Sequence, residues 1–375
     1  MSGKPTLAVV GATGAVGAVL LQMLTHHADV WGEIRLLASS RTAGLPHALD
    51  SVRAGGTRKL SVRGEESEVL ALSEENLTGV DLALFLVPGD VAARWAPIAA
   101  AKGAVVVDTS AAFRADPDVP LVVPEINRSA VRIRPRGIVA SPGCTTLALI
   151  VAVGALHAEF GLAELVVTAQ QAASGAGRAG TGTLREQLAL VTDGELGTHP
   201  GDVRRAVGER TGPFPGPLAL NVLPWSGAPA ADGWSSEELA VREETRKILD
   251  LPGLRVAATC LRVPVVTGHS ASVHARFERP VTVARAHEIL ATSPGVVLYD
   301  DPATGDFPTP ADVVGTDPTW VGRVRRSPDD ERDLEFFVCG DNLRKGAALN
   351  ALQIAEQIAG EIAGEVAPGA AGAGG

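Results

Sequence analysis

Cys144 is the residue of this sequence best placed for covalent chemistry. It stands in the segment Ser141-Pro-Gly-Cys-Thr-Thr, which joins a short apolar stretch to a predicted helix over residues 145–160. A cysteine at a helix N-terminus has its thiolate stabilised by the helix dipole and by free backbone N–H groups. We therefore predict that Cys144 is a nucleophile. Cys260 and Cys339 lie inside strand-like segments, where we expect buried packing residues.

A cysteine nucleophile needs an acid/base partner, and the sequence offers eight histidines. His269 follows Gly268 at the end of an apolar segment, whereas His274 lies inside the next strand-like segment and is expected to be structural. The histidines form no HxxxH pattern and no cluster with cysteine, so we predict no metal site. Spacing alone leaves His269 open as an acid/base partner or as a structural histidine.

The glycine-rich segment 11–17 (GATGAVG) has the spacing of a phosphate-binding turn. It directly follows a strand-like stretch at 6–10 and precedes a helical pattern at 18–24. In such a turn the glycines permit a tight bend, close approach of backbone N–H groups to a pyrophosphate, and close helix packing. A packing turn is the alternative interpretation. The residues expected to contact a dinucleotide are Gly11, Thr13, Gly14, Ala15 and Val16.

The end of the second predicted strand indicates which dinucleotide is bound. An NAD site usually places an acidic residue there to bind the ribose 2′-hydroxyl. Here the strand ends in Ser39, Ser40 and Arg41, two hydroxyls and a cation that suit a 2′-phosphate. The sequence therefore predicts NADP. Short-chain dehydrogenases share this glycine pattern but need a Tyr with a Lys four residues later, and the single tyrosine, Tyr299, is followed there by alanine.

Predicted strands and helices alternate through the first 140 residues. Apolar stretches at 6–10, 34–38, 80–87 and 104–107 suit parallel strands, with a helix predicted at 91–101. We predict an α/β fold that opens with a Rossmann-type doubly wound sheet. Alternating patterns at 255–266, 271–277 and 334–339 predict a mixed sheet in an α+β second domain, and 174–182 reads as a loop. An amphipathic helix over 343–362 is expected to pack back on the first domain.

Composition narrows the classes of partner. The chain has 375 residues, 46% of them hydrophobic, which suits two well-buried domains. Its net charge of −10 argues against a nucleic-acid partner. We see no signal-peptide pattern and no apolar run long enough for a membrane span, and the three cysteines form no CxxC pair. We therefore expect a soluble, cytoplasmic protein.

Nine segments together resemble aspartate-semialdehyde dehydrogenases over nearly the whole chain. They occur in one order, which leaves little room for chance. The segments are GATGAVG (11–17), SSRTAG (39–44), FRADPDVPLVVPEIN (113–127), SPGCTT (141–146), SGAGRAG (174–180), NVLPW (221–225), EETRKIL (243–249), RVPVVTGHS (262–270) and DNLRKGAALNALQIAE (341–356).

The resemblance implies a role for each matching residue. It makes Cys144 the nucleophile and His269 the general acid/base, with Gln171 positioning the acyl intermediate. It assigns Arg262 to the substrate carboxylate and Glu237 to the substrate amino group. Arg114 falls on an arginine of the phosphate subsite. Three further residues are expected at the cofactor: Ser174, Gly175 and Asn342.

The family mechanism implied by the resemblance begins with attack of the Cys144 thiolate on an acyl phosphate. Phosphate leaves, a thioester remains, and hydride from NADPH yields an aldehyde, with His269 handling the proton and backbone N–H groups near Cys144 stabilising the oxyanion. The partners implied are therefore a small-molecule substrate and phosphate. The resemblance also implies a homodimer or homotetramer.

The family also implies a domain organisation. We expect an NADP-binding domain over 1–143 and a catalytic and dimerisation domain over 144–340. A C-terminal helix over 341–365 returns to the first domain, and the last residues, 366–375, form a disordered tail.

Three positions depart from the family pattern. Gly143 stands where an asparagine usually precedes the nucleophile, Ala240 where a phosphate-binding lysine is usual, and Thr109 where an asparagine is usual. Arg178 or Arg242 would have to replace the lysine's charge. Two substrate interpretations therefore stay open: aspartyl phosphate itself, or a modified acyl phosphate or acyl-CoA/carrier thioester reduced by a specialised paralogue. A catalytically idle binding protein is disfavoured because Cys144 and His269 are both present.

Overall fold

The computed structural model describes residues 4–27, 29–39, 58–192, 195–362 and 364. The chain forms two compact units. The first comprises residues 1–124, 128–141 and 348–375, and the second comprises 125–127 and 142–347. The boundaries expected from the sequence, after 143 and after 340, stay predictions of domain organisation. Ser40, Arg41 and the expected tail at 366–375 lie outside the described residues.

The first unit is built on a seven-stranded sheet with the strand order β3-β4-β2-β1-β5-β6-β7. All neighbours pair in parallel except β3 and β4, which are antiparallel. Its central strands are buried on both faces, which explains their continuous apolar sequences. The strands are β1 (Leu7–Val10), β2 (Ile34–Ala38), β3 (Lys59–Val62), β4 (Glu65–Ala71), β5 (Leu82–Phe85), β6 (Val105–Asp108) and β7 (Ile138–Ala140).

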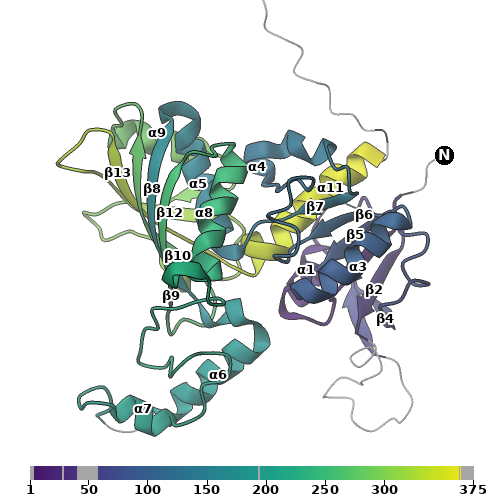
Figure 1. Cartoon of the computed structure of the whole chain (residues 1–375), viewed down its shortest axis with the longest axis horizontal. Helices are drawn as coiled ribbons and strands as arrows, with labels where there is room; N and C mark the ends of the chain where they lie inside the picture. Colours follow the sequence, from purple (N-terminus) through teal and green to yellow (C-terminus); the bar gives the residue numbers. More distant parts are fainter. Residues whose placement is uncertain (1–3, 28, 40–57, 193–194, 363, 365–375) are drawn as a thin grey trace, which may run out of the picture. The chain divides into compact units, whose positions relative to one another are not determined.

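Helices cover both faces of this sheet (Figure 1). Helix α1 (Ala15–Met23) and helix α11 (Leu349–Ile362) share one apolar cluster with alternate strand residues such as Leu82 and Leu84. Because successive side chains of a strand point to opposite faces, Ala83 and Phe85 face the side where α3 (Gly89–Ala101) packs. The doubly wound arrangement and the returning C-terminal helix are thereby confirmed. Two short elements, α4 (Pro124–Asn127) and η1 (Arg128–Arg132), precede β7.

The second unit is built on a six-stranded mixed sheet with the order β11-β12-β13-β10-β8-β9. The pairs β11–β12 and β8–β9 are parallel, and the three central pairs are antiparallel. This arrangement confirms the predicted α+β second domain. The strands are β8 (Leu162–Gln171), β9 (Arg255–Arg262), β10 (His269–Phe277), β11 (Val296–Leu298), β12 (Thr319–Arg326) and β13 (Asp333–Gly340).

Helix α5 (Cys144–Phe160) is the central helix of this unit. It is apolar on all sides and packs against strands β8, β10, β12 and β13 and against two further helices. Such a helix is held in place over its whole length, so its first residue, Cys144, has a fixed position. The other helices are α6 (Gly177–Leu190), α7 (Asp202–Val207), α8 (Ser236–Leu249), α9 (Val283–Thr292) and α10 (Pro310–Val313), with short helical turns η2 (Ala173–Ala176) and η3 (Ala231–Gly233).

The loop predicted at 174–182 is wrong, because η2 and the first turns of α6 occupy these residues. The small residues allow close packing instead of flexibility: a Cβ on Gly180 would lie 2.3 Å from the backbone oxygen of Ala173. The long C-terminal helix is also interrupted. It begins with the π-helical turn η4 (Arg344–Ala348) before α11 starts at Leu349.

Candidate active site

Cys144 is the first residue of α5, and its sulfur faces His269. The distance between Cys144 Sγ and His269 Nε2 is 3.3 Å. Gly143 is the N-cap of the helix and has no side chain to occupy the first-turn N–H groups. Cys144 is partly exposed, whereas Cys260 and Cys339 are fully buried. Burial raises the pKa of both buried thiols to about 12, so neither is a nucleophile near neutral pH.

His269 is the first residue of β10, and its ring is fixed from both sides. Its Nδ1 accepts a hydrogen bond of 3.1 Å from the Ala172 backbone N–H. An accepting Nδ1 carries no proton, so the neutral ring carries its proton on Nε2. That N–H is directed at Cys144 Sγ. His269 therefore faces the sulfur as a hydrogen-bond donor.

The electrostatic surroundings keep His269 neutral. Its side chain is buried, and Arg262 is close enough to oppose a second positive charge. Burial first, and then the charge of Arg262, lower the pKa of His269 to about 3. A neutral ring with its proton on Nε2 can stabilise a thiolate at Cys144 by hydrogen bonding.

Gln171 ends β8 beside Cys144 and belongs to a buried polar cluster. Its Nε2 donates to Thr145 Oγ1 at 2.6 Å and to Glu237 Oε2 at 3.2 Å. Thr145 lies on the first turn of α5, and Glu237 lies on the first turn of α8. The structure thus brings together three of the residues that the resemblance singled out: Cys144, Gln171 and Glu237.

Arg262 ends β9, the strand next to β8, and its guanidinium lies in the same cluster. Its Nη1 donates to Ala172 O at 2.7 Å and its Nη2 to Ser226 Oγ at 2.6 Å. The Ser226 hydroxyl in turn contacts Gln171 Oε1. Sequence analysis missed Ser226, because a serine in a loop between NVLPW and α8 carries no periodic or motif signal.

Ser174, Gly175 and Asn342 surround the turn that leads into His269. Asn342 Nδ2 donates to Ser174 Oγ at 2.9 Å, and its Oδ1 accepts from the Gly268 N–H at 2.9 Å. A Cβ on Gly175 would lie 2.6 Å from Arg262 Nη1 and 3.2 Å from the His269 ring. These three residues therefore help to hold the His269 ring and the Arg262 guanidinium in place. Their contact with a cofactor stays a prediction.

Glu244, a buried residue of α8, was also missed by sequence analysis. Its Oε2 accepts a hydrogen bond of 2.8 Å from the Gly143 N–H. The N–H directly before the nucleophile is thereby occupied, so it is not free for an oxyanion. The N–H groups of Thr145 and Thr146, in the first turn of α5, have no partner among the described residues. An oxyanion hole near Cys144 would draw on this first turn.

The glycine turn of the first unit has the geometry that a dinucleotide requires. Gly11 has a φ of +94°, and a Cβ there would lie 2.3 Å from Leu86 O. Gly14 is the N-cap of α1 and leaves the first-turn N–H groups without a side-chain cap. Ala15 and Val16 begin that helix. Free N–H groups at the positive end of a helix dipole fit a pyrophosphate.

Arg114 lies in the first unit and is bound to backbone carbonyl groups. Its Nε donates to Ser141 O at 3.0 Å and its Nη2 to Thr109 O at 2.6 Å. Thr109 itself donates to Phe85 O. The role of Arg114 in the phosphate subsite stays a prediction. Of the three residues expected at the 2′-phosphate, the structure describes Ser39 alone.

The lysine missing at Ala240 has no evident replacement among the two arginines proposed from sequence. Arg242 pairs with its neighbour Glu243, and Arg178 is exposed on α6.

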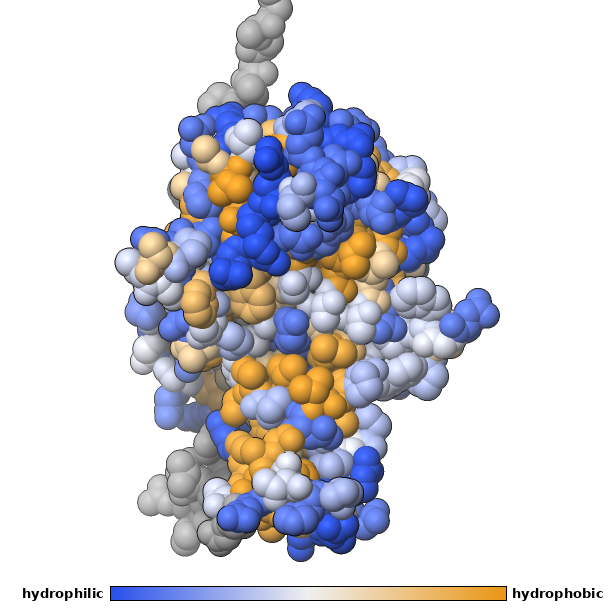
Figure 2. Space-filling model, turned by 90° about the vertical axis from the view of Figure 1, so that its left-hand side faces the viewer, coloured by the Kyte–Doolittle hydropathy of each residue, from blue (hydrophilic) through white to orange (hydrophobic). Residues whose placement is uncertain are grey.

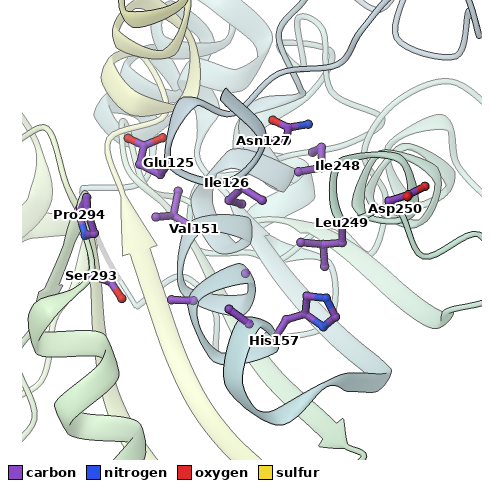
Figure 3. A pocket seen from close by; sticks show the side chains of 13 residues that line it. Glu125, Ile126, Asn127, Val151, His157, Ile248, Leu249, Asp250, Ser293 and Pro294 are labelled. Carbon is purple, nitrogen blue, oxygen red and sulfur yellow. The ribbon is translucent and has the colours of Figure 1, made fainter. Parts of the chain in front are cut away.

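Lys345 is buried, and its Nζ contacts Glu125 at 2.8 and 2.7 Å. This ion pair lies beside a cavity of about 350 Å³ behind α5, which Figure 3 shows with Glu125 in its wall. Cys144 does not line that cavity.

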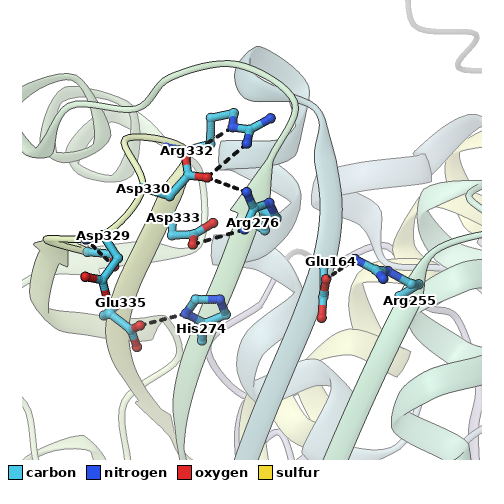
Figure 4. A network of polar contacts seen from close by, with 10 residues as sticks. Glu164, Arg255, His274, Arg276, Asp329, Asp330, Arg332, Asp333 and Glu335 are labelled. Atoms are coloured by element: carbon cyan, nitrogen blue, oxygen red, sulfur yellow. Dashed lines mark hydrogen bonds and ion pairs between the residues drawn. The ribbon is translucent and has the colours of Figure 1, made fainter.

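The remaining candidate features are structural. His274 pairs with Glu335 on the neighbouring strand β13, at the edge of the polar network in Figure 4. Among the described residues there is no group of three or more His, Cys, Asp or Glu side chains that suits a metal ion. No helix in the described part of the chain is long and apolar enough to cross a membrane.

Two family matches cover most of the chain. Residues 6–133 match the family described as semialdehyde dehydrogenase, NAD binding domain, and residues 153–345 match semialdehyde dehydrogenase, dimerisation domain. The aspartate-semialdehyde dehydrogenase of Corynebacterium glutamicum is 44% identical over 359 residues, which is 94% of this chain and 98% of that protein. The chain belongs to the aspartate-semialdehyde dehydrogenase family. The resemblance drawn from nine short segments is thereby confirmed.

Other members of the aspartate-semialdehyde dehydrogenase family agree over the same extent. The enzyme of Streptomyces akiyoshiensis is 43% identical and covers 93% of this chain and 96% of its own. Among solved structures, aspartate semialdehyde dehydrogenase II of Vibrio cholerae, described as complexed with ASA, superposes with a TM-score of 0.83 at 34% identity. That match covers 95% of this chain and 98% of the other. The similarity in sequence and fold therefore extends over nearly the whole of both chains.

Proposed function

We propose that this protein catalyses the reversible, NADP-dependent reductive dephosphorylation of L-aspartyl 4-phosphate to aspartate semialdehyde. The observation that carries the proposal is the position of Cys144 Sγ, 3.3 Å from His269 Nε2 at the start of a buried helix. Arg262, Gln171 and Glu237 lie in the same cluster and supply groups for a carboxylate, an acyl oxygen and an ammonium. Full-length likeness to aspartate-semialdehyde dehydrogenases supports this substrate over a modified acyl phosphate or a thioester.

The first half of the reaction takes place at the sulfur. The Cys144 thiolate attacks the acyl carbon, a C–S bond forms, and the C–O bond to phosphate breaks with its electron pair leaving on phosphate. Phosphate takes up one proton, and the acyl group remains as a thioester. His269 donates its Nε2–H toward Sγ before the attack, which stabilises the thiolate. N–H groups of the first turn of α5 face the developing oxyanion.

The second half releases the aldehyde. The cofactor supplies the hydride that reduces the thioester carbonyl. Cys144 then leaves as the C–S bond of the tetrahedral adduct breaks, and the Nε2–H of His269 again stabilises the departing thiolate. Gly11, Gly14 and the start of α1 would hold the pyrophosphate of the cofactor.

A Cys144→Ser variant tests the proposal. We expect phosphate-dependent oxidation of aspartate semialdehyde by NADP⁺ in the parent, measured by NADPH absorbance, and a loss on the order of a thousandfold or more in the variant. An acylated parent enzyme should carry the added mass on Cys144. Turnover that needs CoA instead of phosphate would contradict the proposal, as would a serine variant as fast as the parent.

Cofactor choice and assembly complete the proposed function. Ser39, Ser40 and Arg41 favour NADP over NAD, and an Arg41→Ala variant should raise the KM for NADP⁺ while leaving the KM for NAD⁺ nearly unchanged. We propose a homodimer or a pair of dimers, because residues 153–345 match a dimerisation domain. We place the enzyme in the cytoplasm, where a reducing environment keeps the Cys144 thiol out of disulfide bonds.

A further inference from the structure

The Ser226 hydroxyl connects two side chains that meet the substrate in the proposed reaction. It contacts Gln171 Oε1 and lies 2.6 Å from Arg262 Nη2. Ser226 is 3% exposed, and both of its partners are also buried. A buried hydroxyl between two buried polar groups has no water to replace either bond.

Hydrogen-bond polarity fixes the direction of each bond. A guanidinium only donates, so Arg262 donates to Ser226 and the hydroxyl proton of Ser226 is left for Gln171. That proton requires the carbonyl oxygen of the Gln171 carboxamide on the Ser226 side. The amide nitrogen must then face the other way, where Glu237 and Thr145 accept from it. Glu237 only accepts, so both ends of the chain of bonds demand the same orientation.

The backbone holds Ser226 at this point. Leu223 and Arg262 exchange two backbone hydrogen bonds of 2.9 and 2.8 Å, which fasten the loop to the end of β9. Gly227 has a φ of +88°, and a Cβ there would lie 2.5 Å from Ser236 Oγ and 2.9 Å from Glu237 Cγ. The loop therefore presses closely on the start of α8. Ser226 has little freedom to turn away from the cluster.

We infer that Ser226 is a positioning residue that fixes the orientation of the Gln171 carboxamide and aligns it with the Arg262 guanidinium. The inference rests on the proposed function, because it assigns Ser226 a part in binding the aspartyl substrate. Without the hydroxyl, Gln171 Oε1 loses its donor and Arg262 Nη2 loses its acceptor. The carboxamide is then held only at its nitrogen, by Glu237 and Thr145, so its oxygen and the Arg262 guanidinium are no longer aligned.

A pair of variants with the same shape isolates the hydroxyl. Ser226→Thr keeps it and Ser226→Val removes it, while both add the same side-chain volume. We expect the valine variant to have a kcat/KM for aspartate semialdehyde about tenfold or more below that of the threonine variant. KM for NADP⁺ should agree between the two within about twofold, since the partners of Ser226 are Gln171 and Arg262 and neither is a residue expected at the cofactor. Ser226→Ala should behave like the valine variant.

The same Ser226 substitutions in a Gln171→Ala enzyme separate a positioning role from general damage to the structure. With Gln171→Ala present, the threonine and valine variants should differ clearly less than they do in the parent background, because the carboxamide that Ser226 orients is gone and only the contact with Arg262 remains. Thr245→Val is the matched control: it removes a buried hydroxyl that has no hydrogen-bond partner in the described structure, and kcat/KM should stay at the parent value.

The outcomes distinguish this inference from the proposed function. Equal activity of the threonine and valine variants overturns the role of Ser226, and so does an equal loss in the Gln171→Ala background. A parent enzyme without any phosphate-dependent turnover overturns the proposed function instead.

Discussion

At the residue scale, His269 shows how surroundings set chemistry. The Ala172 N–H occupies Nδ1, and burial together with Arg262 lowers the pKa of the ring to about 3. The neutral ring therefore faces Cys144 with a proton on Nε2. In this arrangement the Cys144 proton leaves to solvent or substrate phosphate, because Nε2 has no lone pair free to take it.

The lowered pKa of His269 predicts a pH dependence of stability. A histidine with a depressed folded pKa binds its proton more readily in the unfolded chain, so its contribution is complete above about pH 6.5 and is lost as the pH falls toward 3. When the pH is lowered from 6.5 to 5.0, the unfolding free energy of a His269→Gln variant should fall by roughly 2 kcal/mol less than that of the parent. Urea unfolding at the two pH values measures this difference.

The exposed His199 provides the control for that experiment. His199→Gln should follow the parent at both pH values. If His269→Gln also followed the parent, the ring would be charged or accessible in the folded protein, and the neutral donor would be excluded.

At the scale of elements, the strand ends and the turns after them bring the site together. Gln171 is the last residue of β8 and Arg262 is the last residue of the parallel neighbour β9, so the two residues lie side by side at the same end of the sheet. His269 is the first residue of the antiparallel neighbour β10 and therefore lies at the same end of the sheet. Helix α5 then brings Cys144 to the same place. Cys144 and His269, 125 positions apart in the chain, become neighbours because strands of a sheet have defined ends.

Gly175 lies where these elements leave no room for a larger side chain. We expect Gly175→Ala to lower kcat/KM about a hundredfold, because the new Cβ would displace Arg262 Nη1 and press on the His269 ring. Steady-state kinetics with aspartate semialdehyde measures the loss. Gly182→Ala is the matched control, since its Cβ meets nothing within 4 Å inside α6. That variant should keep parental kinetics and gain about 0.5–1 kcal/mol of stability.

Glu244 provides a second prediction about an element, the start of α5. Glu244→Ala leaves the Gly143 N–H without its acceptor and should cost about 1–3 kcal/mol of unfolding free energy. Glu244→Gln keeps an acceptor oxygen and should lose clearly less. Thermal or urea unfolding of the two variants compares them, and an alanine variant as stable as the glutamine variant would rule out this contact as a support of the helix.

At the scale of the whole molecule, assembly follows from the second unit. Large apolar side chains such as Val166, Leu220 and Phe307 are exposed there. Figure 2 shows apolar residues gathered in patches on one face of the molecule. Exposed apolar patches of this kind mark interaction surfaces. Together with the dimerisation-domain match, they favour burial against a second copy.

Light scattering should therefore give a particle of twice the 38.5 kDa chain mass, or four times that mass for a pair of dimers. The mass should stay constant on dilution into the low micromolar range used for kinetics. A particle of single-chain mass with full activity would contradict the predicted homodimer.

The sequence by itself determined the chemistry and the fold class. Three features were sufficient to predict both: Cys144 before an apolar helix, the glycine turn after the first strand, and nine segments in one order. Each of these features can be seen directly in the local spacing of residues. The alternation of strands and helices predicted the doubly wound sheet for the same reason. The resemblance also named Gln171, Arg262 and His269 before any of them had a place in space.

The tertiary structure decided the contacts between distant residues. Ser226 and Glu244 carry no sequence signal, and they matter because folding places one hydroxyl between Gln171 and Arg262 and one carboxylate on the Gly143 N–H. The helix at 177–190 was missed because its glycines serve packing against Ala173, which composition does not reveal. The state of His269 likewise depends on burial and on the backbone N–H of Ala172, the residue that follows β8. Such properties arise between elements, so no single stretch of sequence contains them.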